Sequence, residues 1–126
     1  MTTMTTKQLV TAHSRWLEVM VNARRLLSKP GKWSRTTFNL NNRGLPCAIT
    51  EAQRYSLIGA LEWGLDDPNE LYAVCSYMCR SLGLKGNLHD WHRRLEEGGE
   101  TVVLADVLKL LNKAIVMTER TIIDND

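Results

Sequence analysis

The sequence predicts a mainly α protein, a compact bundle of four to five helices with one short β-hairpin after the first helix. Apolar residues recur at three- and four-residue steps over most of the chain, as in helices that bury one face. Capping residues precede these stripes, and glycine or proline follows them. One turn-forming run interrupts a stretch of β-branched and aromatic residues. Since 126 residues suit one core, we expect residues 1–126 to form a single helical domain.

The first helix is expected to begin near Thr5 or Thr6, because a threonine hydroxyl can accept from the free amides of a first turn. We expect it to run to about Lys29, before Pro30 and Gly31 change the direction of the chain. Its apolar residues form one stripe: Leu9, Ala12, Trp16, Val19, Met20, Ala23, Leu26 and Leu27.

Residues 33–49 are the one region expected to be extended. Residues 36–40 lead into the turn-forming run 41–44, and residues 45–47 follow it, a pattern that predicts a short hairpin. Pro46 would confine its strand to an edge or a bulge, because proline has no amide hydrogen for a ladder.

The second and third helices each begin at a capping signal. Residues 50–53, Thr-Glu-Ala-Gln, have the pattern of a capping box and predict a helix over 51–63. Asp67, followed by proline, predicts the start of a third helix that ends at Gly83. The third helix would turn these residues inward: Leu71, Val74, Cys75, Met78, Cys79 and Leu82.

The fourth and fifth helices complete the expected bundle. Asn87 can cap a short helix that the glycines at 98 and 99 would end. The last helix has a nearly unbroken apolar stripe between residues 104 and 118.

Composition limits the classes of protein to which this chain can belong. A hydrophobic share of 44% with 24% charged residues is ordinary for a globular protein. No run approaches the ~20 apolar residues that cross a bilayer, and residues 1–7 lack the pattern of a secretory signal. Three cysteines, an odd number, suit a reducing compartment. We therefore expect a cytoplasmic protein.

Charge is distributed unevenly along the chain. Residues 1–46 carry eight lysines and arginines against the single Glu18, a net charge of +7, whereas the remaining residues carry a net charge of −5. Such asymmetry predicts an acidic partner. The leading hypothesis is a non-catalytic binding or regulatory module that engages an acidic protein partner. The residues expected to form its surface are Arg15, Arg24, Arg25, Lys29, Lys32, Trp33, Arg35 and Arg43.

Nucleic acid is the alternative partner. Trp33 lies between Lys32 and Arg35, and aromatic rings stack on bases where cations neutralise phosphates. The competing interpretation is that Trp33 folds back over the end of the first helix. A formal net charge of only +2 favours a protein partner.

A second alternative is a small zinc or cysteine-dependent enzyme. Cys75 and Cys79 share one helix face, and His89 and His92 lie on the next predicted helix, so the four could surround a zinc ion. Both cysteines also lie on an apolar stripe, as core cysteines do. A thiolate nucleophile would need one of the cysteines, including Cys47, beside a histidine such as His13. Since no phosphate-binding loop or other catalytic motif is present, we expect a protein without metal, cofactor or catalysis.

Four motifs, in order, carry a resemblance to a known family. They are Leu27-Ser28-Lys29-Pro30-Gly31-Lys32-Trp33, the turn before Gly44-Leu45-Pro46, the stretch Arg54-Tyr55-Ser56-Leu57-Ile58-Gly59-Ala60-Leu61, and Asp106-Val107-Leu108-Lys109-Leu110-Leu111-Asn112-Lys113-Ala114-Ile115. Together they resemble the uncharacterised bacterial and phage domain family numbered 6197, over most of residues 20–116. This chain differs from it at Ser56, where the family has Cys, and at Trp91-His92-Arg93, where the family has Trp-Asn-Asp. The resemblance implies shared fold and ancestry, and a phage or mobile-element accessory protein acting on a host protein.

Overall fold

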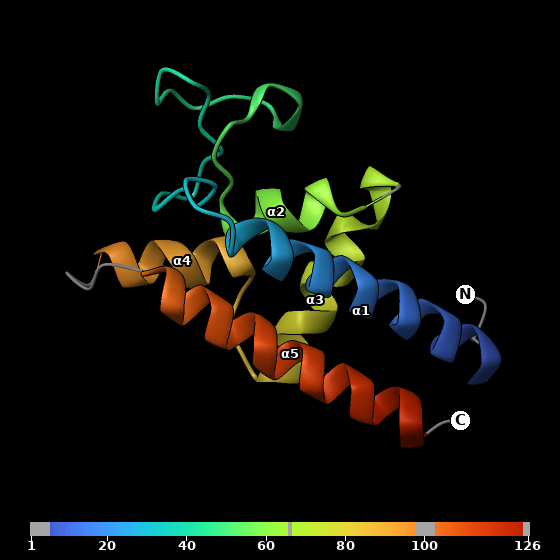
Figure 1. The fold of residues 1–126 in the computed structure, drawn as a ribbon. Coiled ribbons are helices and arrows are strands. Elements are labelled where there is room, and N and C mark those ends of the chain that lie inside the picture. Colours follow the sequence, from blue (N-terminus) through green and yellow to red (C-terminus); the bar gives the residue numbers. More distant parts are fainter. Residues whose placement is uncertain (1–5, 66, 98–102, 125–126) are drawn as a thin grey trace.

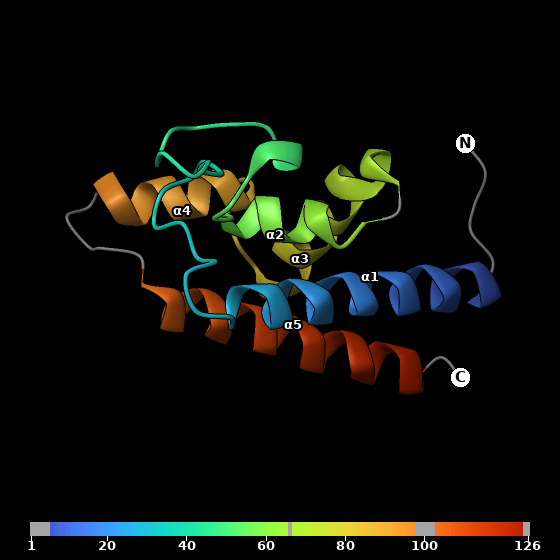
Figure 2. The ribbon, with the colours of Figure 1, turned by 45° about the horizontal axis from the view of Figure 1, so that its top comes forward.

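Five α-helices make up most of the described part of the chain, residues 6–65, 67–97 and 103–124, in the computed structural model. They are α1 (Thr6–Leu27), α2 (Leu57–Trp63), α3 (Leu71–Leu82), α4 (Leu88–Glu97) and α5 (Leu104–Asp124). Helices α1 and α5 run antiparallel, side by side (Figure 1). Helices α2, α3 and α4 lie together on one side of this pair (Figure 2). The prediction of a mainly α helical bundle is confirmed.

Helix α1 forms because its apolar residues fall on one face. The inward positions Ala12, Met20 and Ala23 are at most 2% exposed, as an amphipathic helix requires. The helix ends at Leu27 rather than Lys29, and the Lys29 amide closes a tighter turn onto the Leu26 carbonyl. Gly31 follows with a φ of 75°, a conformation that residues with a Cβ rarely adopt.

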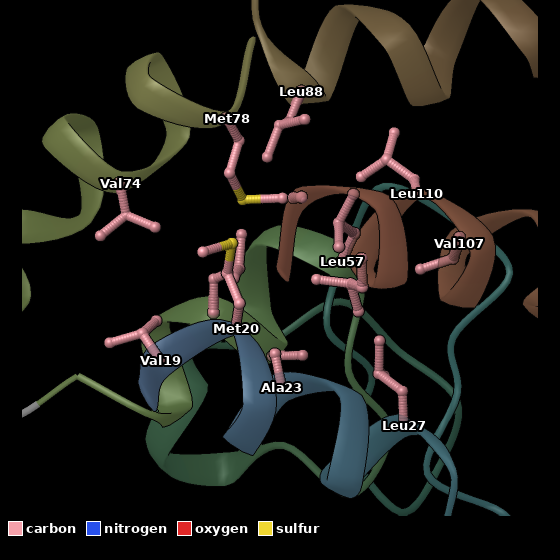
Figure 3. Packing of buried hydrophobic residues seen from close by; sticks show 14 of the residues in the cluster. Val19, Met20, Ala23, Leu27, Leu57, Val74, Met78, Leu88, Val107 and Leu110 are labelled. Atoms are coloured by element: carbon pink, nitrogen blue, oxygen red, sulfur yellow. The ribbon is translucent and has the colours of Figure 1, made fainter. Parts of the chain in front are cut away.

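All five helices contribute to one hydrophobic core (Figure 3). The labelled side chains that meet there are Val19, Met20, Ala23, Leu27, Leu57, Val74, Met78, Leu88, Val107 and Leu110. The short α4 supplies Leu88, which is 1% exposed and fixes the start of that helix against the bundle. Burial of this surface is the main force that assembles the helices.

The predicted start of the second helix at Glu51, with Thr50 as its cap, is wrong. Residues Ile49–Glu51 form a single 3₁₀ turn, and α2 begins only at Leu57. A capping box needs the Gln53 amide to donate to the Thr50 hydroxyl, but that amide donates to the Leu40 carbonyl at 2.8 Å. Ser56 is the actual cap, because its Oγ accepts from the Gly59 amide at 3.1 Å.

The predicted hairpin over residues 36–47 is not supported, because the described residues contain no β-strand. The turn itself is present, since the Asn41 amide donates to the Leu45 carbonyl at 2.9 Å. Beyond it the described residues form only isolated bridges, antiparallel from Leu40 to Pro46 and to Arg54 and parallel from Trp33 to Tyr55. Pro46 has no amide hydrogen and so cannot extend a ladder.

The remaining helix boundaries follow the predicted local signals. Asp67 Oδ1 accepts from the Asn69 amide at 3.0 Å, and the 3₁₀ turn Pro68–Glu70 leads into α3. Gly83 ends α3 in the left-handed conformation, with a φ of 68°. Asn87 caps α4 by accepting from the Asp90 amide. The predicted stop at residues 98 and 99 lies outside the described residues. Among the described helices, none is both long and apolar enough to cross a bilayer.

The two candidate caps of α2 can be separated by mutation. Ser56→Ala removes the Oγ that holds the Gly59 amide and should lower the free energy of unfolding by about 1–2 kcal/mol. Thr50 is exposed, so Thr50→Ala should change it by less than about 0.5 kcal/mol. Urea denaturation followed by circular dichroism measures both. A larger loss for Thr50→Ala than for Ser56→Ala would contradict this assignment.

Candidate functional site

Two of the predicted surface cations are engaged within the fold. Arg15 forms an ion pair with Glu70 in which the two side-chain atoms are 3.2 Å apart. Arg24 donates to the Asn112 side chain at 2.8 Å and so links α1 to α5. Neither pairing could be read from the sequence, because Asn112 lies 88 residues from Arg24 and Glu70 lies on another element. These two arginines are therefore less available to a partner than the others.

Three cations gather where α1 ends, and we name Arg25, Lys29 and Lys32 the α1-end cluster. Arg25 and Lys29 are exposed, and Lys32 is half-buried. They are neighbours along the chain: Arg25 lies in the last turn of α1, Lys29 lies in the tight turn that follows, and the Lys32 amide donates to the Lys29 carbonyl. None of the three forms an ion pair with a carboxylate of residues 6–65, 67–97 or 103–124.

Trp33 packs inward, against the α4 histidine His92. The two rings are nearly parallel, with centroids 5.8 Å apart and planes 15° apart. His92 is 2% exposed, and its Nε2 donates to the Arg35 carbonyl at 3.0 Å. Trp33 therefore helps to hold the chain after α1 against α4, with one face of its ring already occupied. Neither sequence interpretation of Trp33 named His92 as its partner.

The chain between α1 and α2, residues 28–56, projects from the helices (Figures 1 and 2), and we name it the connecting segment. It is held to α2 by Asn39, whose Oδ1 accepts from the Ser56 amide at 3.1 Å and the Ser56 hydroxyl at 3.3 Å. The Asn39 amide group lies where a Cβ at residue 59 would be, so Gly59 leaves it room. Within the segment, Ser34 is 1% exposed, and its hydroxyl donates to the Phe38 carbonyl at 2.8 Å.

The connecting segment presents three further cations to solvent. Arg35, Arg43 and Arg54 are all exposed, and none forms an ion pair with a carboxylate in the part of the chain that the structure describes. Arg54 was not among the predicted surface residues, because it lies beyond the strongly basic first third of the sequence. The bridge from Arg54 to Leu40 brings it onto this segment.

The cysteines and histidines do not assemble into a reactive site among the described residues. Burial, together with the neighbouring Cys79, raises the pKa of the Cys75 thiol to about 12, and burial raises the pKa of Cys79. Both thiols are therefore protonated near neutral pH, whereas nucleophiles and metal ligands are thiolates. No group of three or more potential metal ligands comes together in the described residues.

His13 belongs to an aromatic cluster rather than to a thiol pair. Its ring lies 5.4 Å from Trp16 and 5.1 Å from Tyr77, measured between centroids. Burial lowers the pKa of His13. The Tyr77 hydroxyl in turn meets the Thr118 hydroxyl at 2.8 Å, so the cluster joins α1, α3 and α5. The arrangement suits packing between these helices.

Comparisons with known proteins identify no relative: no family model, no curated protein and no solved structure matches the chain. The resemblance to the family numbered 6197 stays a prediction.

The Cys75 thiol should be nearly inert in the folded protein. A pKa of about 12 lowers its thiolate fraction near pH 8 roughly 1000-fold relative to an ordinary cysteine. Alkylation by iodoacetamide, followed by peptide mass spectrometry, should show a correspondingly slow reaction in buffer and a fast one in urea. Equal rates in the two conditions would contradict the raised pKa, and a faster reaction in buffer would show an activated thiol.

His92 should carry much of the attachment between the connecting segment and α4. His92→Ala removes the ring that stacks on Trp33 and leaves the Arg35 carbonyl without its donor, so it should cost about 2–3 kcal/mol of stability. His89 is half-buried on the same helix, and His89→Ala is the matched control, expected to cost less than about 1 kcal/mol. Chemical denaturation measures both. A stability loss for His92→Ala no greater than for His89→Ala would refute the role.

Proposed function

We propose that this protein is a non-catalytic binding module that engages an acidic protein partner through the α1-end cluster and the cations of the connecting segment. The observation that supports the proposal most is that Arg25, Lys29, Lys32, Arg35 and Arg43 form no ion pair with any described carboxylate. Cations left unpaired within a fold are free to be paired by another molecule.

Local charge supports the same proposal. Between residues 25 and 54 the chain carries six lysines and arginines against the single Glu51, a net charge of +5, although the whole chain is only +2. A concentrated positive field raises the association rate with an acidic partner and specifies its orientation more than it raises affinity. The raised pKa values of Cys75 and Cys79 argue against thiol chemistry as the competing function.

Nucleic acid remains the second candidate, and one observation favours it. Phe38 is 55% exposed on the connecting segment, between Arg35 and Arg43 in sequence, and exposed rings beside cations bind single-stranded bases. Against it, Trp33 already stacks on His92, which leaves Phe38 without a second stacking ring of the predicted kind. A protein partner is therefore preferred. An accessory protein of a phage or mobile element, as the resemblance implies, would suit this binding role.

Charge reversal of the α1-end cluster tests the proposal. The double variant Arg25→Glu with Lys29→Glu should weaken binding of a fluorescein-labelled polyglutamate peptide about tenfold or more at low salt, and by less as salt screens the field. The control is Lys85→Glu with Arg120→Glu, which changes net charge equally at two exposed residues outside the basic region. Fluorescence anisotropy measures the dissociation constants.

The outcomes separate the candidate functions. Salt-sensitive binding of polyglutamate that the control variant retains would support an acidic protein partner. Binding of single-stranded DNA by a protein that ignores polyglutamate would replace the proposal with the nucleic-acid alternative. If neither probe binds even at low salt, or if the control variant weakens binding as much as the α1-end variant, the proposal fails.

A further inference from the structure

We infer that one side of the connecting segment is a docking face, formed by Phe38, Leu40, Pro46 and Arg54, whose occupant is an acidic protein segment that also carries apolar side chains. The inference rests on the proposed function and adds to it an apolar component of recognition. General attraction between opposite charges cannot select one acidic protein among many, whereas an apolar contact among the charges can.

Backbone pairing places Leu40, Pro46 and Arg54 on one side. Leu40 is bridged by Pro46 on one side and by Arg54 on the other, and side chains of directly paired residues project to the same face. Phe38 ends the bend of residues 35–38, two residues before Leu40, and its 55% exposed side chain is the nearest exposed apolar group before these paired residues along the chain. The paired face therefore combines two apolar side chains with one guanidinium group, and we infer that the exposed Phe38 ring, two residues before Leu40, adds to it.

The opposite side of the same stretch is the one attached to the helices. Asn39 alternates with Leu40, and its side chain reaches Ser56 at the start of α2. Cys47 alternates with Pro46, is joined to Asn39 by a backbone hydrogen bond of 3.0 Å, and packs against the hydrophobic core. Since Asn39 and Cys47 point inward, the side with Leu40 and Pro46 points outward.

Three of the four residues of the proposed face are exposed to solvent. Phe38 is 55% exposed, Pro46 and Arg54 are exposed, and Leu40 is half-buried. The largest aromatic surface of the segment is thus left in water, at a cost that burial against a partner would remove.

The face is ordered before any partner arrives. The Leu40 amide donates to the Arg54 carbonyl, and the Arg54 amide donates to the Leu40 carbonyl, both at 3.0 Å. The carbonyl of Phe38 accepts from the buried Ser34 hydroxyl at 2.8 Å and from the Thr36 hydroxyl at 3.1 Å. A surface fixed in this way loses little conformational entropy on binding, so a small apolar contact can contribute fully to affinity.

Charge determines the chemistry of the occupant. Arg54 lies on the face, and Arg35 and Arg43 lie on the same segment, while Glu51 is the one carboxylate between residues 28 and 56. None of these arginines forms an ion pair with a described carboxylate. A purely apolar partner would desolvate the guanidinium groups without pairing them, which is unfavourable. A purely acidic partner would leave Phe38 in water, so an acidic segment with interspersed apolar residues satisfies both.

A pair of exposed residues gives a matched test. Phe38 and Leu45 are each 55% exposed on the connecting segment, but Leu45 pairs with Asn41 next to the Leu40–Pro46 bridge. Adjacent pairs alternate in direction, so Leu45 projects to the other side. Phe38→Ser should therefore weaken docking, and Leu45→Ser should not.

Two labelled peptides of equal length and charge serve as probes, one built of Glu-Glu-Leu repeats and the other of Glu-Glu-Ser repeats. The wild-type protein should bind the leucine peptide about tenfold more tightly than the serine peptide, the advantage expected from partial burial of one large apolar contact. Phe38→Ser should abolish that advantage and leave serine-peptide binding unchanged. Leu45→Ser should retain it. Circular dichroism confirms that both variants are folded.

Each result decides the inference. If both peptides bind equally to the wild type in a salt-sensitive way, the docking face is refuted while the proposed function stands. Equal losses for Phe38→Ser and Leu45→Ser refute the assigned side. If neither peptide binds at low salt, the proposed function fails and the docking face fails with it. Vesicles of equal parts phosphatidylglycerol and phosphatidylcholine that bind through Phe38, when the leucine peptide does not, would make the occupant a membrane and overturn the inference.

Discussion

Backbone pairing of residues 53–55 is the constraint on which the remaining architecture depends. The amides of Gln53 and Arg54 donate to the Leu40 carbonyl, and the Tyr55 amide donates to the Lys32 carbonyl at 2.7 Å. These bonds hold Arg54 and Tyr55 in bridges to earlier parts of the segment, and α2 begins only at Leu57. They also join the two ends of the connecting segment, so that a 29-residue excursion between helices has a defined shape instead of acting as a loose loop.

Local signals were sufficient for most helices and failed where distant residues competed for the same amide. Gly83 and Asn87 act within one turn of the residues that they cap, so sequence alone predicts their roles. Thr50 satisfies the local pattern equally well, but the amide that it needs is bonded to Leu40. That competition depends on tertiary pairing, which a local sequence pattern cannot predict.

Part of the candidate binding surface could likewise be predicted from the sequence, and part of it could not. The concentration of positive charge after α1 is a property of composition and could be predicted, whereas the engagement of Arg15 by Glu70 and of Arg24 by Asn112 depends on helix packing. Arg54 joins the surface only through its pairing with Leu40. Trp33 was expected either on the binding surface or over the helix end, and its partner His92 lies 59 residues away. A sequence therefore shows how much charge a region carries, but only the folded structure shows which cations are paired and which are free.

The missing side chain at Gly59 restricts which sequences can adopt this fold. A helix interior normally disfavours glycine by about 1 kcal/mol relative to alanine, yet any larger residue here would displace the Asn39 amide that fastens the connecting segment to α2. The packing of the connecting segment and the absence of a side chain at position 59 therefore depend on each other. Any sequence that keeps the bond from Asn39 to the α2 cap must also keep glycine three positions after that cap, whatever its surface charges are.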